Sequence, residues 1–150
     1  MGKSFMARTI PKPHKRQSLF KGLSESVKAR QDEQDRMFLV SFKDMDRTQG
    51  QTFAEWESEE LLSKALETLR DYCCAPLLDQ AGSKFTIYGS FPPDEKTDFT
   101  KPKHIPEDAQ WARIHVAGEP CIIGHVVRNV FYVVFLDKKH KFYKSELKHT

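Results

Sequence analysis

A short basic run near the C-terminus gathers the side-chain types that chemistry on a phosphate needs. Its residues, in order, are Asp137, Lys138, Lys139, His140, Lys141, Phe142, Tyr143 and Lys144. Cutting a phosphodiester requires a group that exchanges protons and a cation that stabilises the developing negative charge. We therefore expect His140 or Tyr143 to exchange the proton and Lys139 to stabilise the charge. The alternative interpretation is a soluble basic terminus whose aromatic rings pack back onto the domain.

A second group of chemically capable residues alternates along an apolar segment. Trp111, Arg113 and His115 are each separated by one residue, so in a strand all three share a face. An indole stacks on a base, a guanidinium binds phosphate and an imidazole transfers protons near neutral pH. The same pattern also suits an ordinary exposed strand face.

These two segments define the predicted site. The predicted catalytic residues are Arg113, Lys139, His140 and Tyr143. The predicted nucleic-acid contacts are Trp111, His115, Arg128, Lys138, Lys141 and Lys144. The expected ligand of such a site is RNA.

The other motifs argue against several further kinds of chemistry. The histidines at 115, 125 and 140 form no closely spaced pair and Cys121 is a poor additional ligand, so the spacing does not predict a zinc site. The sequence contains no P-loop, no dinucleotide-binding glycine motif and no serine-hydrolase elbow. Cys73 and Cys74 fall at the end of a predicted helix, where the helix dipole disfavours a thiolate. We expect no metal and no cofactor.

The elements that must position these residues follow from the spacing of apolar side chains. Residues 37–42 alternate as a strand, and residues 53–74 repeat apolar side chains at helical spacing. Thr52 and Glu55 fit a capping box at the start of this helix, and Pro76 marks its end. Residues 84–88 fit a short strand, and three apolar runs at 111–116, 121–127 and 130–136 fit a meander with tight turns.

The predicted fold is therefore α+β, an antiparallel sheet of about four strands with one long amphipathic helix packed on one face. We expect residues 1–36 to form a flexible basic N-terminal arm, helical near 24–36, and residues 37–150 to form a single domain with an irregular insert at about 75–110. The second face of the sheet would then stay partly open, as a platform for a ligand or RNA.

The formal charge of +3 conceals a strong asymmetry along the chain. Residues 1–36 have a balance of +5, residues 37–110 of −6 and residues 138–150 of +4. Basic ends attract phosphate, anionic surfaces or acidic proteins. The sequence shows no membrane-spanning run and no signal peptide, and its three unpaired-looking cysteines are typical of a reducing compartment. We expect a cytoplasmic protein with no membrane partner.

The order of these elements resembles the RelE/ParE-like toxin superfamily of bacterial toxin–antitoxin systems. The segment 111–123 is similar to that family's arginine-bearing strand, glycine-containing turn and following apolar strand, and the run ending in His140 and Tyr143 lies where the family places basic and aromatic catalytic groups. The resemblance covers residues 37–50 and 111–143. It implies a ribonuclease acting on ribosome-bound messenger RNA, or a gyrase poison, neutralised by an antitoxin-like protein partner.

Three functions therefore remain open at the level of sequence. The first is an endoribonuclease with the catalytic residues given above. The second is a non-catalytic nucleic-acid-binding module whose basic ends supply the affinity. The third is a protein-interaction module whose N-terminal arm folds on an acidic partner.

Overall fold

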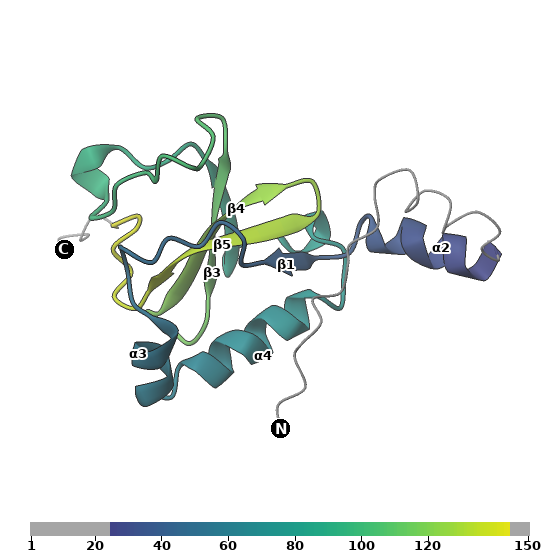
Figure 1. The fold of residues 1–150 in the computed structure, drawn as a ribbon, viewed down its shortest axis with the longest axis horizontal. Helices are drawn as coiled ribbons and strands as arrows, with labels where there is room; N and C mark the ends of the chain where they lie inside the picture. The colour runs from purple at the N-terminus through teal and green to yellow at the C-terminus, as the bar shows by residue number, and fades with distance from the viewer. Residues whose placement is uncertain (1–24, 145–150) are drawn as a thin grey trace, which may run out of the picture. The chain divides into compact units, whose positions relative to one another are not determined.

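The computed structural model describes residues 25–144. The chain divides into two compact units, and the boundary between them falls between Glu33 and Gln34. The described part of the first unit is essentially one polar helix, α2 (Glu25–Gln34), so the helix expected near 24–36 is confirmed. The rest of the predicted arm, residues 1–24, lies outside the described residues. The second unit is the α+β domain drawn in Figure 1.

The domain is built on a five-stranded mixed sheet with the strand order β1-β5-β4-β3-β2. The strands are β1 (Leu39–Ser41), β2 (Phe85–Gly89), β3 (Gln110–His115), β4 (Cys121–Val127) and β5 (Val130–Asp137). Strands β2 to β5 pair antiparallel, which confirms the predicted meander. The predicted antiparallel sheet of about four strands is matched only in part, because the sheet has five strands and β1 pairs with β5 in parallel.

The single helix expected over 53–74 is divided in two. Helix α3 (Phe53–Ser58) starts with the predicted capping box, in which Thr52 and Glu55 bond each other's backbone N–H groups at 3.1 Å. Helix α4 (Leu62–Tyr72) follows a break at Glu60, whose φ of 60° is left-handed. The break turns Trp56 of α3 and the apolar stripe of α4 toward the same core.

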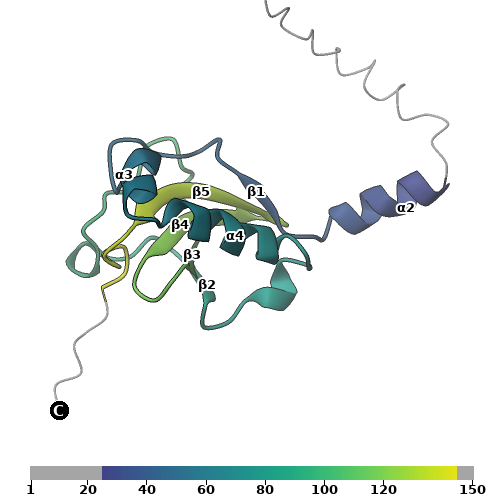
Figure 2. The same cartoon turned by 90° about the horizontal axis from the view of Figure 1, so that it is seen from below.

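One face of the sheet packs against these two helices, as Figures 1 and 2 show. Its fully buried side chains include Phe38, Trp56, Phe85, Ile114, Ile122 and Phe131. The rings of Phe38, Phe85 and Phe131 contact one another at centroid distances of 5.5–6.1 Å. This aromatic cluster fixes β1, β2 and β5 relative to one another.

The second face of the sheet is covered by a separate core, which corrects the expectation of an open platform. The insert between β2 and β3 contains the 3₁₀ turn η2 (Asp94–Lys96), and it lays Phe99 and Ile105 over this face. Phe142, from the segment after β5, is fully buried beside them. Trp111 is only 1% exposed and contacts the Phe91 ring at 5.0 Å.

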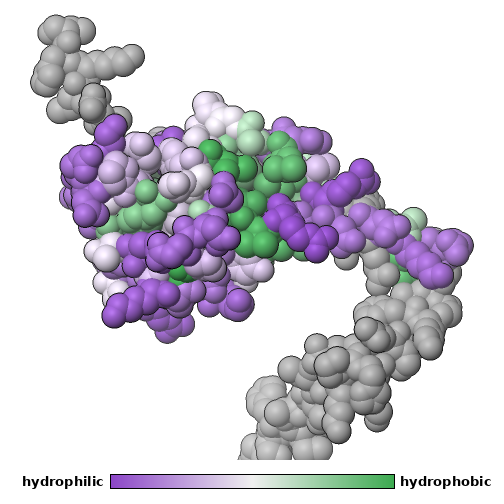
Figure 3. Space-filling view, turned by 90° about the horizontal axis from the view of Figure 1, so that it is seen from above, coloured by the Kyte–Doolittle hydropathy of each residue, from purple (hydrophilic) through white to green (hydrophobic). Residues whose placement is uncertain are grey.

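Only one end of the second face stays uncovered. Leu39 and Val127 both pair with Val130 in the sheet register, and both remain exposed. Figure 3 shows an apolar area on the surface of this side of the domain. A further 3₁₀ turn, η1 (Leu78–Gln80), links α4 to β2. None of the helices among residues 25–144 is both long and apolar enough to cross a membrane.

Candidate functional site

The candidate site lies at the sheet end where β3 finishes, β4 begins and β5 finishes. In the register, His115 pairs with Cys121 and Cys121 pairs with Asp137. Arg113 projects from β3 toward the same place, and His140 enters it from the turn after β5. Three neighbouring strands therefore bring a guanidinium, two imidazoles and a thiol together.

The contact that defines the site joins Arg113 to His140. Arg113 Nη1 donates a hydrogen bond to Nε2 of His140 at 2.9 Å. A guanidinium can only donate, so this Nε2 carries a lone pair and the proton of the neutral ring is on Nδ1. The Arg113 guanidinium also lies over the Tyr88 ring at 5.2 Å, and its Nε is buried without a hydrogen-bond partner among the described residues.

His115 is the second imidazole of the site. Its Nδ1 donates to the Gly118 carbonyl oxygen at 2.8 Å, and its ring stacks on the His140 ring at a centroid distance of 5.3 Å. Burial lowers the pKa of His115, the hydrogen bond to Gly118 opposes this, and the positive charge of Arg113 lowers the pKa further. His115 is therefore neutral at pH 7, with the lone pair on Nε2.

Cys121 lies directly beneath the imidazoles. Its Sγ is 3.4 Å from His115 Nδ1 and donates to the Glu119 carbonyl oxygen at 3.2 Å. The side chain is fully buried, and this burial raises the pKa of the thiol to about 12. The sulfur is therefore a protonated thiol at neutral pH.

The turn that carries His140 is held by a buried carboxylate. Asp137, only 2% exposed, accepts hydrogen bonds from the backbone N–H groups of Lys141 at 2.9 Å and Phe142 at 2.8 Å. Burial raises the pKa of Asp137, and these two hydrogen bonds oppose the rise. His140 itself has a φ of 58°, a left-handed conformation that is costly for a residue with a β-carbon. The bonds to Asp137 and the burial of Phe142 maintain it.

The Tyr88 ring lies between Tyr143 and Arg113 and contacts both side chains. The Tyr143 ring stacks on Tyr88 at a centroid distance of 4.9 Å, and Arg113 lies over that same Tyr88 ring. The Tyr88 hydroxyl is buried without a hydrogen-bond partner among the described residues, and burial raises its pKa to about 12. Lys139, beside His140 in the chain, is exposed.

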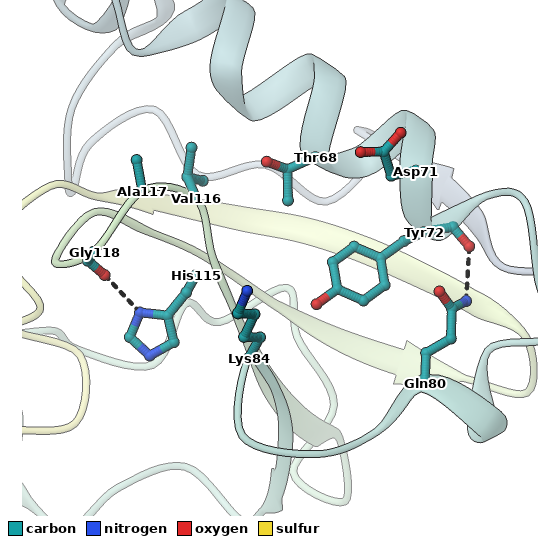
Figure 4. Close-up of a pocket in the computed structure, with 9 residues that line it drawn as sticks. All are labelled: Thr68, Asp71, Tyr72, Gln80, Lys84, His115, Val116, Ala117 and Gly118. Atoms are coloured by element: carbon teal, nitrogen blue, oxygen red, sulfur yellow. Dashed lines mark hydrogen bonds between the residues drawn. The ribbon is translucent and has the colours of Figure 1, made fainter.

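A cavity of about 470 Å³ opens beside His115, between α4 and the β3–β4 turn. Tyr72, Asp71 and Lys84 line it with His115 and the backbone of Gly118. Figure 4 shows the hydroxyl end of Tyr72 and the ammonium of Lys84 pointing into this space. The cavity is large enough for a nucleobase, and it offers an aromatic ring, a carboxylate and a cation to one.

The structure gathers part of the predicted site. The sequence-predicted residues that meet at or beside the cluster are Arg113, His115, Lys139, His140, Lys141 and Tyr143. Lys139 and Lys141 are exposed on the turn that carries His140.

The other residues predicted to contact nucleic acid lie away from the cluster. Trp111 is enclosed in the second core and presents no surface to a base. Arg128 lies in the β4–β5 turn, at the opposite end of the strands from Cys121. Lys138 points to the helix face, where its Nζ is 2.5 Å from Glu59, and Lys144 is paired with Asp98 at 2.8 Å.

Sequence reasoning missed Tyr88 and Cys121 as parts of the site. Cys121 is the direct cross-strand partner of His115, and the turn residues 117–120 between them gave a signal for that pairing. Tyr88 joins through the pairing of β2 with β3, whose register the sequence does not reveal. His125 takes no part, because its Nε2 bonds Asp44 at 2.8 Å and its ring stacks on Tyr132.

Comparison with protein-family models, with curated proteins and with solved structures finds no match in any of the three. The resemblance to RelE/ParE-like toxins therefore stays a prediction.

Proposed function

We propose that this protein is a RelE-like endoribonuclease that binds RNA and cleaves a phosphodiester bond at the Arg113–His140 cluster. The observation that carries the proposal is the 2.9 Å hydrogen bond from Arg113 to His140, with His115 stacked on the same imidazole. This reaction needs a cation that binds the phosphate and an imidazole whose lone pair becomes free when that cation moves to the phosphate.

The proposed reaction begins with exchange of the hydrogen bond made by Arg113. When a phosphate enters, Arg113 turns from His140 to the phosphate oxygens and so frees the lone pair on His140 Nε2. This nitrogen takes the proton of the 2′-hydroxyl, and the resulting oxygen attacks phosphorus while the 5′ oxygen leaves. Tyr143 returns a proton to the leaving oxygen, and Lys139 stabilises the charge on the phosphate.

Binding of the RNA rests on the surroundings of the cluster. Lys139 and Lys141 are exposed on the turn that carries His140, where they can contact neighbouring phosphates. The cavity beside His115 is placed to receive an adjacent base, with the Tyr72 ring and the Lys84 ammonium on its wall. We propose that this cavity contributes to base preference.

The test is cleavage of a labelled RNA by the purified protein and two variants. His140→Asn removes the proton-exchanging group but keeps a residue that tolerates left-handed φ, and Arg113→Gln removes the cation. Each should lower the cleavage rate about 10²-fold or more. The matched control is His104→Asn, an exposed histidine that bonds the Asp44 carbonyl oxygen away from the cluster and should cleave normally. Equal cleavage by all four proteins would reject the proposal.

A non-catalytic RNA-binding module is the second candidate, favoured by the exposed lysines of the His140 turn. It predicts binding that weakens steeply as salt increases, with no turnover. Binding without cleavage under all conditions would select this candidate, and Tyr143→Phe and His115→Asn would then weaken affinity rather than rate.

A further inference from the structure

Three side chains of the cluster form a set of metal ligands in their own right. His115, Cys121 and His140 each offer one ligand atom, and these atoms all lie within 4.8 Å of one another. Among the residues that the structure describes, no other group of three or more His, Cys, Asp and Glu side chains is gathered in this way. Two imidazoles and a thiol are a ligand set suited to zinc and related ions.

The hydrogen bonds around these histidines fix which nitrogen of each ring carries the lone pair. The Nδ1 proton of His115 is held by the Gly118 carbonyl oxygen at 2.8 Å, which leaves the lone pair on Nε2. Metal-binding histidines almost always donate their other N–H in this way, because the bond fixes the tautomer and the ring orientation. His140 also has its lone pair on Nε2, where Arg113 now donates.

The backbone also holds the three ligand residues in place before any ion binds. His140 keeps its left-handed φ of 58° because Asp137 and the buried Phe142 hold the turn on both sides. Cys121 is placed opposite His115 by the sheet register. The three ligand residues therefore come from two paired strands and one braced turn, so little of the chain needs to be ordered when an ion binds.

We propose that His115, Cys121 and His140 bind a zinc-class divalent ion. Tetrahedral bonds of about 2.0 Å to nitrogen and 2.3 Å to sulfur place the ligand atoms about 3.3–3.5 Å apart. Because these atoms now lie within 4.8 Å of one another, the side chains must close by about 1 Å. The ion replaces the proton of the Cys121 thiol, which is released to solvent as the sulfur becomes a thiolate ligand. A fourth position is left to a water molecule.

Arg113 and the ion compete for the same nitrogen of His140. The Arg113–His140 bond must break when the ion binds, and the nearby guanidinium charge repels the ion. As a consequence that rests on the proposed function, the metal-bound site has no free His140 lone pair and the ion inhibits RNA cleavage. Binding itself does not depend on that function.

The experiment is a cobalt titration of the full-length chain carrying C73S and C74S, so that Cys121 is its only thiol. We expect one equivalent of Co²⁺ to bind, with a sulfur-to-cobalt charge-transfer band that Zn²⁺ abolishes by displacement. Adding C121S removes that band, and His140→Asn or His115→Asn weakens binding at least about tenfold. Arg113→Gln tightens it by about tenfold or more. His104→Asn is the matched control and leaves binding unchanged.

The outcomes separate this inference from the proposed function. The absence of a thiolate–cobalt band in the C73S/C74S chain, or equal binding after His140→Asn, overturns the metal site. Cobalt binding with no RNA cleavage in chelator keeps the metal site and rejects the ribonuclease. When the protein both binds cobalt and cleaves RNA, Zn²⁺ slows cleavage by the C73S/C74S chain. When C121S is added to that chain, its cleavage rate is the same with and without Zn²⁺.

Discussion

At the scale of the residue, Asp137 decides where His140 lies. Its carboxylate is the acceptor for two backbone N–H groups in the turn that follows β5, and it touches neither imidazole in the contacts described. Asp137 is therefore a positioning residue. The position of His140 in the cluster therefore depends on Asp137, although Asp137 does not contact either imidazole in the contacts described.

Replacing Asp137 by Ala should leave both N–H groups without their partner. The Phe142 N–H is buried, and an unsatisfied buried donor costs about 1–3 kcal/mol, so we expect the free energy of unfolding to fall by about 1–3 kcal/mol. Urea denaturation measures this fall, and a cobalt titration should show weaker binding because His140 is displaced. The control Asp98→Ala removes only an exposed pair with Lys144 and should be close to neutral. An unchanged unfolding midpoint in Asp137→Ala would contradict the assignment.

Tyr88 gives the site a signature at alkaline pH. Burial raises its pKa from 10.0 to about 12, so the folded state holds the phenol proton more tightly than the unfolded state does. The stabilisation is complete below pH 10 and is lost as the pH rises from about 10 to 12. The fall in Tm over this range should be shallower for Tyr88→Phe than for the unchanged protein. Parallel Tm curves for the two proteins would show that Tyr88 is not buried as described.

At the scale of the element, the pairing of β4 with β5 requires a glycine at position 124, where there is no room for a side chain. A β-carbon at Gly124 would lie 2.1 Å from the Tyr132 carbonyl oxygen and 2.9 Å from the Phe131 ring. The register of the two strands shifts at this glycine. Close backbone approach here lets β5 deliver Asp137 and His140 to the site.

Gly124→Ala should therefore force the two strands apart. We expect a loss of about 1–3 kcal/mol in the free energy of unfolding, as for other overpacked positions. Gly82→Ala is the matched control, because no heavy atom lies within 4 Å of its added β-carbon. Urea denaturation of the two variants should separate them clearly, and equal midpoints would contradict the packing.

Local sequence patterns predicted most elements because each depends on neighbouring residues. The capping box of Thr52 and the three runs of the meander appear where their apolar spacing placed them. The parallel pairing of β1 and the helix break at Glu60 depend on contacts distant in sequence, and no local period encodes them. Alternation placed Trp111 on the correct face but did not reveal that the insert covers it.

The candidate site was partly predictable for the same reason. His140 was chosen because it follows the most buried strand, and that position does place it at the sheet end. Lys138 instead pairs with Glu59, because side chains at 137 and 138 point to opposite faces of an extended chain. Spacing along the chain did not reveal that Cys121 lies opposite His115, because cross-strand partners are adjacent in space at any turn length.

At the scale of the whole molecule, the lysines that follow β5 differ in whether an acidic side chain neutralises them. The acidic residues of α3 and the following break include Glu59, which neutralises Lys138 on the helix face. Lys139 and Lys141 remain exposed on the turn beside Arg113 and His140. Under the proposed function, these exposed lysines would attract the phosphates of RNA to the side of the described domain that carries the cluster.

The most direct test of the ribonuclease proposal compares two oligonucleotides in the presence of chelator. One is RNA, and the other is identical except for a 2′-deoxy sugar at the cleaved nucleotide. The account predicts cleavage of the RNA alone, leaving a 2′,3′-cyclic phosphate, with a rate at least about 10²-fold lower for His140→Asn. Cleavage of both oligonucleotides, or of neither, would contradict it.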